Sequence, residues 1–392
     1  MSSFRQIYTV TRMNLLNMPQ RLGGASVVVI GNAGVVVVLV SVLAMAVGFS
    51  HTINGTGRPD RVIVLRGGSS SELSSVLTRD TVDVIVDAPG VKTVAGQPVA
   101  SREIVVGVDL PKKGGGGSDS VTLRGVSAQA PAVRPEIQLT GGRLFSSGKH
   151  ELIVGRAAQL QFAGLAVGNH VKLGSSDWNV VGSFTSRGDL HESELLADVV
   201  SVAELYRRRS FNSIAALLES PQAFETFKTA VSSDPQLSVE VVRESDYFAA
   251  LSKQLTRTLT LVGFLVGAIM SIGAIFGALN TIYAAVSSRR VEIATLRAIG
   301  FGADSVAISV IVEAMLLSLA GGAVGALLAW SVFDGNAVNT LGGRTQVVFQ
   351  FMVTPALVLL GLLLAAAIGF VGGVVPAIRA ARMPVATALR TL

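Results

Sequence analysis

Four long apolar runs dominate the pattern of the chain. They cover residues 25–49, 258–286, 305–333 and 354–375, and Glu313 is the single charged residue within them. A helix needs about 20 mostly apolar residues to cross a bilayer. The pattern therefore predicts four transmembrane helices.

The stretch between the first two apolar runs has a different pattern. Residues 51–250 alternate short apolar runs with turn signals such as Gly96–Pro98 and the glycine-rich 114–117. This alternation is typical of a compact domain of helices and strands. Residues 244–286 are predicted to form one long helix that begins in this domain and continues into the second apolar run.

Basic residues near the ends of the apolar runs predict the side of the membrane on which each connecting segment lies. Cytoplasmic loops carry an excess of Lys and Arg, and segments 1–24, 287–304 and 376–392 each hold three arginines, whereas 334–353 holds one. We therefore expect both termini and 287–304 to be cytoplasmic, and the inserted domain and 334–353 to lie outside. The predicted fold class is an integral membrane α-helical protein with an α+β extracytoplasmic domain between the first and second spanning helices.

The N-terminal 24 residues carry an amphipathic pattern. Apolar residues recur at helical spacing up to Pro19, which predicts a short helix on the inner leaflet. The apolar run that follows is longer than the roughly 7–15 residues of a secretory signal. We expect an uncleaved anchor rather than a signal peptide.

Small residues recur inside the apolar runs at spacings that suit close helix packing. Gly263 with Gly267 and Gly273 with Gly277 are the pairs in the second run. Glu313 is costly inside a membrane, so it is expected to face the interior of the bundle, where it supports packing or coupling, or to mark a transport path.

Composition supports the membrane assignment. Charged residues make up 15% of the chain and the mean hydropathy is +0.57, whereas soluble proteins carry about 25% charged residues. The net charge of +6 comes from arginines beside apolar runs, so we expect no nucleic-acid partner. Cysteine is absent and there are four histidines, so neither a disulfide framework nor a thiolate metal site is predicted.

Enzyme motifs are not found. The segment Gly142–Lys149 has the wrong glycine spacing for an ATP-binding loop, with His150 where a Ser or Thr is needed. No GxSxG motif occurs. His191 lies near Asp189 and Glu192, which predicts a solvated polar loop. We expect no catalytic residue, no metal and no cofactor bound by this chain.

Three segments resemble the MacB/FtsX-like permease family of ABC transporters. The first is SRRVEIATLRAIGF at 288–301, the second is PAIRAARMPVATALR at 376–390, and the third is GRLF at 142–145 with ELIVG at 151–155. The resemblance covers nearly the whole chain, but the ATPase domain of MacB itself is missing. It implies that 287–304 is a coupling helix that docks on a separate ATPase, with seven candidate contact residues: Arg289, Arg290, Glu292, Thr295, Leu296, Arg297 and Gly300.

The resemblance also implies partners and a mechanism. A second permease copy, identical or a sister, would pair with this chain, and an ATPase dimer carrying ATP and magnesium would dock below. A periplasmic adaptor, an outer-membrane duct and membrane lipid are the other expected partners, and the bacterial inner membrane is the expected location. Export or efflux from the periplasm or outer leaflet by mechanotransmission is the leading function. Lipoprotein extraction and FtsX-like activation of a cell-wall hydrolase are the alternatives.

These inferences divide the chain into predicted segments. They are a cytoplasmic N-terminal helix (1–24), TM1 (25–50), a periplasmic MacB-like core domain (51–250), a stalk helix with TM2 (251–286), the coupling helix (287–304), TM3 (305–333), a short extracytoplasmic loop (334–353), TM4 (354–375) and a cytoplasmic tail (376–392).

Overall fold

The computed structural model describes residues 3–16, 22–115, 117–234, 237–339 and 348–383. Contacts within the chain define two compact units. The first comprises Met1–Val47, Thr256–Asn336 and Phe351–Leu392, and the second comprises Gly48–Leu255 and Ala337–Gln350. We call them the membrane unit and the inserted domain.

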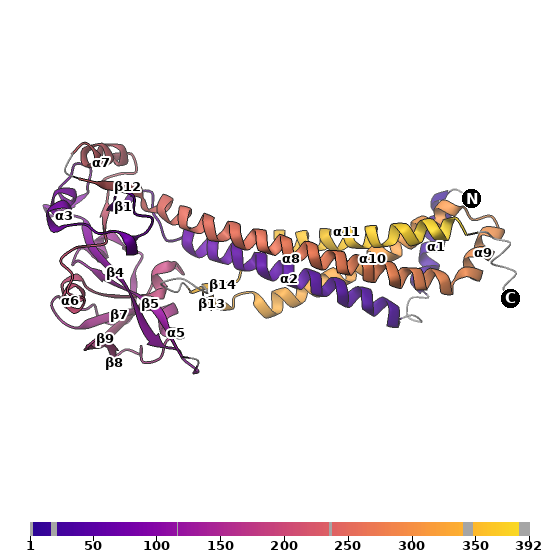
Figure 1. Ribbon diagram of the computed structural model, residues 1–392, viewed down its shortest axis with the longest axis horizontal. Coiled ribbons are helices and arrows are strands. Elements are labelled where there is room, and N and C mark those ends of the chain that lie inside the picture. The colour runs from indigo at the N-terminus through magenta and orange to yellow at the C-terminus, as the bar shows by residue number, and fades with distance from the viewer. Residues whose placement is uncertain (1–2, 17–21, 116, 235–236, 340–347, 384–392) are drawn as a thin grey trace. The chain divides into compact units, whose positions relative to one another are not determined.

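Four helices that are long and apolar enough to cross a membrane supply most of the membrane unit (Figure 1). They are α2 (Leu22–Asn54), α8 (Glu244–Ser288), α10 (Ala303–Phe333) and α11 (Pro355–Ala381). All four contribute to one buried apolar cluster, with Val28, Ile282, Val310 and Ala377 among its members. The short helices α1 (Ser3–Leu16) and α9 (Arg290–Ala298) complete this unit. Pro19 lies outside the described residues.

Glycines allow α10 to approach its neighbours closely. A Cβ atom on Gly321 or Gly325 would lie 2.5 Å from Val29 O and 2.6 Å from Ala33 O of α2, respectively. Asn32 of α2 donates a hydrogen bond of 3.0 Å to Ser318 Oγ of α10. Such small-residue contacts and buried polar links are typical of helix packing in membranes.

The inserted domain is built on one mixed ten-stranded sheet (Figure 1). Its hydrogen-bonded order is β12-β1-β11-β4-β5-β10-β7-β9-β6, with β8 paired to β9. The β10–β5 and β7–β9 pairs are parallel and the others antiparallel. The strands are β1 (Arg61–Arg66), β4 (Ala100–Pro111), β5 (Ser118–Val126), β6 (Gln138–Gly142), β7 (Glu151–Gly155), β8 (His170–Leu173), β9 (Ser176–Thr185), β10 (Glu194–Asp198), β11 (Ser213–Leu217) and β12 (Val239–Arg243).

Two apolar cores lie along this sheet. One surrounds Trp178 and Phe162, and the other surrounds Phe227 and Ile85. Helices α5 (Arg156–Gln161) and α6 (Val199–Leu205) contribute to the first core, and α3 (Arg79–Val86) and α7 (Ala223–Ser232) to the second. The other short helices are η2 (Glu72–Ser74), α4 (Ala130–Val133) and η3 (Leu190–Ser193). A two-stranded ribbon, β2 (Thr93–Val94) with β3 (Gln97–Pro98), lies outside the main sheet. The predicted fold class, four apolar helices with an α+β domain inserted between the first and second, is confirmed.

The connection between α10 and α11 joins the inserted domain. It contains the hairpin strands β13 (Ala337–Asn339) and β14 (Val348–Gln350). The backbone N–H of Val348 donates to Ser193 Oγ at 3.0 Å, and Phe349 packs edge-on against Phe49 with ring centroids 5.4 Å apart. The described strands of this connection therefore belong to the inserted domain. Arg344 lies outside the described residues.

Candidate coupling site

Helix α9 forms the turn between α8 and α10. It begins at Arg290, after Arg289 leaves helical geometry with φ −105° and ψ 16°. It ends before Gly300, which adopts a φ of +102°. There the N–H of Phe301 donates to Leu296 O at 3.1 Å, which is how a glycine with positive φ terminates a helix. Gly300 therefore shapes the end of the predicted coupling segment.

The faces of α9 differ in exposure. Ile293 and Ala294 are buried against the membrane unit. Arg290, Thr295 and Ile299 are exposed, and Ile299 leaves 69% of its surface open. The exposed part of α9 therefore combines polar and apolar side chains.

Arg289 connects α9 to α10. Its guanidinium lies 3.0 Å from Glu292 and 3.4 Å from Glu313. Its side chain is 7% exposed and that of Glu313 is 17% exposed. The structure therefore brings Glu313 together with Arg289, two residues that the sequence identified separately. We call Arg289, Glu292 and Glu313 the coupling triad.

Arg297 connects α9 to α11. It is half-buried, and its Nη1 donates to the carbonyl oxygens of Ala381 at 2.9 Å and Met383 at 2.7 Å. A cation at the end of a helix stabilises the unpaired carbonyl groups there. Arg297 therefore faces into this chain, whereas the sequence pattern placed it toward a soluble partner. Its long side chain reaches the end of α11, a contact that only packing reveals.

A cavity of about 510 Å³ adjoins the coupling triad. Its walls come from α1, the start of α2, the end of α8, α9 and α10, and the triad residues line it together with apolar side chains such as Ile293 and Leu317. Ile293 belongs both to the wall of this cavity and to the buried apolar cluster of the membrane unit.

The predicted glycine pairs of α8 have different surroundings. A Cβ on Gly263 or Gly267 would lie about 3 Å from Val42 Cγ1 or Leu39 Cδ1 of α2, at 3.1 and 3.0 Å. A Cβ on Gly273 or Gly277 would meet nothing described within 4 Å. The first pair packs against α2, and the second makes no such close contact with the described residues.

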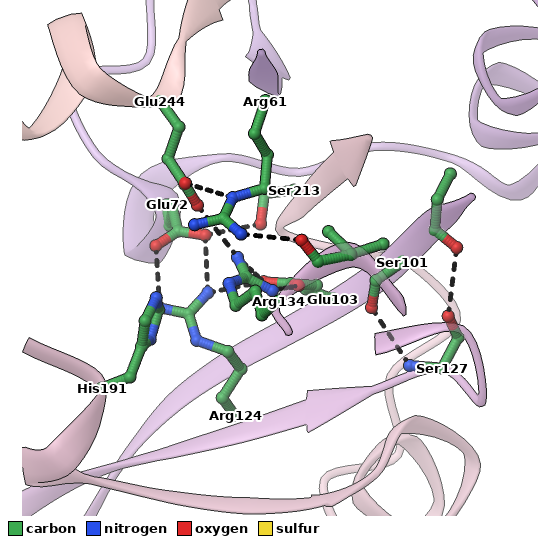
Figure 2. A network of polar contacts seen from close by, with 12 residues as sticks. Arg61, Glu72, Ser101, Glu103, Arg124, Ser127, Arg134, His191, Ser213 and Glu244 are labelled. Carbon is green, nitrogen blue, oxygen red and sulfur yellow. Dashed lines mark hydrogen bonds and ion pairs between the residues drawn. The ribbon is translucent and has the colours of Figure 1, made fainter. Parts of the chain in front are cut away.

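The inserted domain contains a second group of charges, which the sequence did not reveal (Figure 2). Arg124 of β5 lies within 2.6–2.8 Å of the carboxylates of Glu72, Glu103 and Glu194. Arg134 pairs with Glu103 as well. All five side chains are at most 8% exposed.

The same network holds the first residue of α8. Glu244 is fully buried and pairs with Arg61 of β1, and with Arg134 at 3.4 Å. Arg61 also pairs with Glu136 at 2.5 Å. A carboxylate at the start of a helix is further stabilised by the helix dipole. We call the set formed by Arg61, Glu72, Glu103, Arg124, Arg134, Glu136, His191, Glu194 and Glu244 the buried charge network.

His191 belongs to this network, which corrects the prediction of a solvated loop. Its side chain is 0% exposed, and Nδ1 lies 2.9 Å from Glu194. Asp189 is 5% exposed and accepts hydrogen bonds from Ser186 Oγ and from the backbone N–H of His191. The local sequence is polar, but residues distant along the chain pack on it, such as Phe248 of α8, whose ring centroid lies 6.3 Å from that of His191.

Burial and neighbouring charges alter the pKa values in the network. Burial lowers the pKa of His191, but the charge and hydrogen bond of Glu194 together with the charge of Asp189 outweigh it, so the net pKa lies above its ordinary value. Burial raises the pKa of Asp189 to about 6. Burial also opposes ionisation of Glu103 and Glu194, but the arginines overcome this and hold the pKa of each below its usual range. Opposite charges held close in a low-dielectric interior explain the pKa shifts of His191, Glu103 and Glu194, whereas desolvation explains that of Asp189.

Family models match both parts of the chain. The model described as the MacB-like periplasmic core domain matches residues 25–234, and the model described as the FtsX-like permease C-terminal matches residues 264–385. The chain belongs to the MacB/FtsX-like permease family. The predicted resemblance is therefore confirmed, and the chain has the role of an ABC transporter permease.

Individual relatives match parts of this permease. The macrolide export ATP-binding/permease protein MacB of Hahella chejuensis is 26% identical over 231 residues, which are 55% of this chain and 34% of the relative. The chain thus spans about a third of the length of the curated relative it matches.

Two solved structures are also similar to the permease. The periplasmic region of MacB from Actinobacillus actinomycetemcomitans has 14% identity and a TM-score of 0.38, over 51% of this chain and 95% of that chain. The extracellular domain of the noncanonic ABC-type transporter YknZ from Gram-positive bacteria has 15% identity and a TM-score of 0.35, over 47% of this chain and 100% of that chain.

Proposed function

We propose that the permease couples ATP hydrolysis by a separate ATPase dimer to export or efflux from the periplasm or outer leaflet. The observation that carries this is the placement of α9, whose outer face is open while Arg289 and Arg297 tie it to α10 and α11. An ATPase that docks on α9 would move both helices. This is mechanotransmission, in which no substrate passes between the spanning helices.

The proposed location is the bacterial inner membrane, with both termini and α9 in the cytoplasm. The arginines near α9 and at both ends support this direction. The hairpin of β13 and β14 supports it too, because it packs on the inserted domain and both were expected outside. ATP and magnesium would be bound by the ATPase, and this chain would bind no cofactor.

The proposed assembly contains two permeases. Gly273 and Gly277, which meet nothing described in this chain, would pack against a second permease copy or membrane lipid. A periplasmic adaptor and an outer-membrane duct would complete an exporter. Lipoprotein extraction or FtsX-like activation of a hydrolase would use the same coupling site with different outer partners.

The docking claim can be tested on the exposed face of α9. In the variant Ile299→Asp, a buried carboxylate would oppose docking, so we expect about tenfold or greater loss of the ABC ATPase that co-purifies with the native chain from its own cells. Arg382→Glu is the matched control, because Arg382 is an exposed residue at the end of α11. It should retain the ATPase. Absence of an ATPase from the native preparation, or equal retention in the two variants, would contradict the proposal.

A further inference from the structure

We propose that the inserted domain binds a small amphipathic carboxylate in a cavity beside the buried charge network. The ligand would combine an apolar group about the size of a benzene ring with one carboxylate. The site lies between β6, β7, β10 and α4. The inference does not depend on the coupling function of α9.

The cavity has apolar walls and an apolar rim. It measures about 170 Å³, and Val126, Ile153 and Leu196 form buried parts of its wall. Leu139 and Leu144 also line it and remain 41% and 44% exposed. Apolar cavities of about 150 Å³ in proteins stay dry and take benzene. The size and lining of this cavity therefore suit an apolar ring or a short branched chain.

The polar side of the cavity is cationic. Its ionisable lining residues are Arg124, Arg134 and His191, whereas their carboxylate partners Glu103 and Glu194 do not line it. The network thus presents its positive groups toward this space. A carboxylate accepts hydrogen bonds from both guanidinium and imidazolium groups.

Two buried donor positions on this side have no hydrogen-bond partner among the described residues. They are Nε2 of His191 and Nε of Arg134, on side chains that are 0% and 2% exposed. A buried polar atom without a partner costs free energy that a ligand can recover. Both residues line the same cavity.

The contact of His191 with Glu194 sets what Nε2 can do. A carboxylate only accepts, so Nδ1 at 2.9 Å from Glu194 carries a proton. In the imidazolium form, which Glu194 stabilises, Nε2 carries a proton as well and donates. A ligand carboxylate would then accept from His191 Nε2 and Arg134 Nε, which the carboxylates of the network leave unpaired.

Fluorine NMR with para-fluorobenzoate as the probe tests the site. The full chain is placed in nanodiscs, with empty nanodiscs as the background. We expect saturable line broadening that unlabelled benzoate reverses. Para-fluorobenzyl alcohol, which lacks the carboxylate, should bind about tenfold more weakly or worse. Equal affinity for the alcohol would overturn the assignment of a carboxylate.

Variants locate the binding. Leu144→Asp puts a negative charge at the rim and should lower the affinity about tenfold or more. Leu160→Asp is the matched control, because Leu160 is a 68% exposed leucine of α5 that does not line the cavity. His191→Asn keeps a donor near Glu194 but removes Nε2, and should also weaken binding.

Because Leu144 lies on the surface, its variant keeps the test decisive even if His191→Asn folds poorly. Binding no greater than in empty nanodiscs, as expected if water alone fills the cavity, would overturn the proposal. Equal affinities in Leu144→Asp and Leu160→Asp would overturn it as well.

Discussion

The coupling triad and the buried charge network both contain ion pairs, but they differ in how exposed those pairs are. Each places an arginine among several carboxylates inside the protein. In the triad, Arg289 is 7% exposed but Glu292 is 33% exposed and a cavity of about 510 Å³ lies beside them. In the network, Arg124 and Glu103 are 2% and 0% exposed. The first cluster has room to rearrange, and the second is closed on most sides.

From this difference in exposure we infer different roles for the two clusters. Buried ion pairs are costly to desolvate, so each partner becomes essential once the others are buried. The network links β1, β4, β5, β10 and the first residue of α8, and therefore fixes the start of that helix to the sheet. The triad has fewer and more exposed partners, which is what the proposed function requires of an ionic link between α9 and α10.

The largest expected effect is the loss of Arg124. Arg124→Met removes the only arginine that contacts all three of Glu72, Glu103 and Glu194 among the described residues, and we expect the free energy of unfolding of the inserted domain to fall by about 3–5 kcal/mol. Urea unfolding in nanodiscs measures this through the fluorescence of buried Trp178 in a Trp330→Phe background.

Arg102→Met is the control for Arg124→Met. Arg102 pairs with Asp83 on the surface, with side chains 42% and 60% exposed, so the loss should be below about 1 kcal/mol. Similar losses in the two variants would mean that burial does not determine how much an arginine of this domain contributes to stability.

A smaller effect is expected from the titration of Asp189. Its folded pKa of about 6 lies above the ordinary value of 3.8, so the folded state binds more protons between these values. Stability should therefore decline as pH rises from about 4 to 6, by an amount of order 2–3 kcal/mol for this residue. The raised pKa of His191 acts in the same direction at higher pH.

Asp189→Asn removes this titration, and its unfolding free energy should lose the decline between about pH 4 and 6. The lowered pKa values of Glu103 and Glu194 remain, so stability should still fall when their folded carboxylates are protonated at low pH. The exposed Asp83→Asn serves as the comparison and should keep the native profile. An unchanged slope in Asp189→Asn would show that other groups control it.

The smallest effect is expected in the coupling triad. A double-mutant cycle with Arg289→Gln and Glu313→Gln should give an interaction energy of about 0.5–3 kcal/mol, at the lower end because Glu292 still neutralises Arg289. Unfolding by sodium dodecyl sulfate, followed by circular dichroism, measures it. An interaction energy near zero would mean that the two residues act independently and that α9 is not linked to α10 through them.

Parts of the site were visible in the sequence because they are local. Glu313 stands out as a charge inside an apolar run, and the arginines of 288–301 stand out beside one. The glycines of the 263/267 pair were identified by spacing and lie against α2, while Gly321 and Gly325, which are no less close to α2, were missed. Spacing shows that a close approach is possible and cannot show which neighbour uses it.

The sequence by itself determined the four apolar helices, the inserted domain and the family, because hydrophobicity and short motifs are read from neighbouring residues. Only the tertiary structure decided the contacts of the charges. Arg61 and Glu244 are 183 positions apart, and Arg124 and Glu194 are 70 apart. A charged residue in a strand is predicted to lie on the surface unless its partner is known, because burial of an ion depends on the ions packed against it. For that reason His191 was expected in solvent and lies in the core.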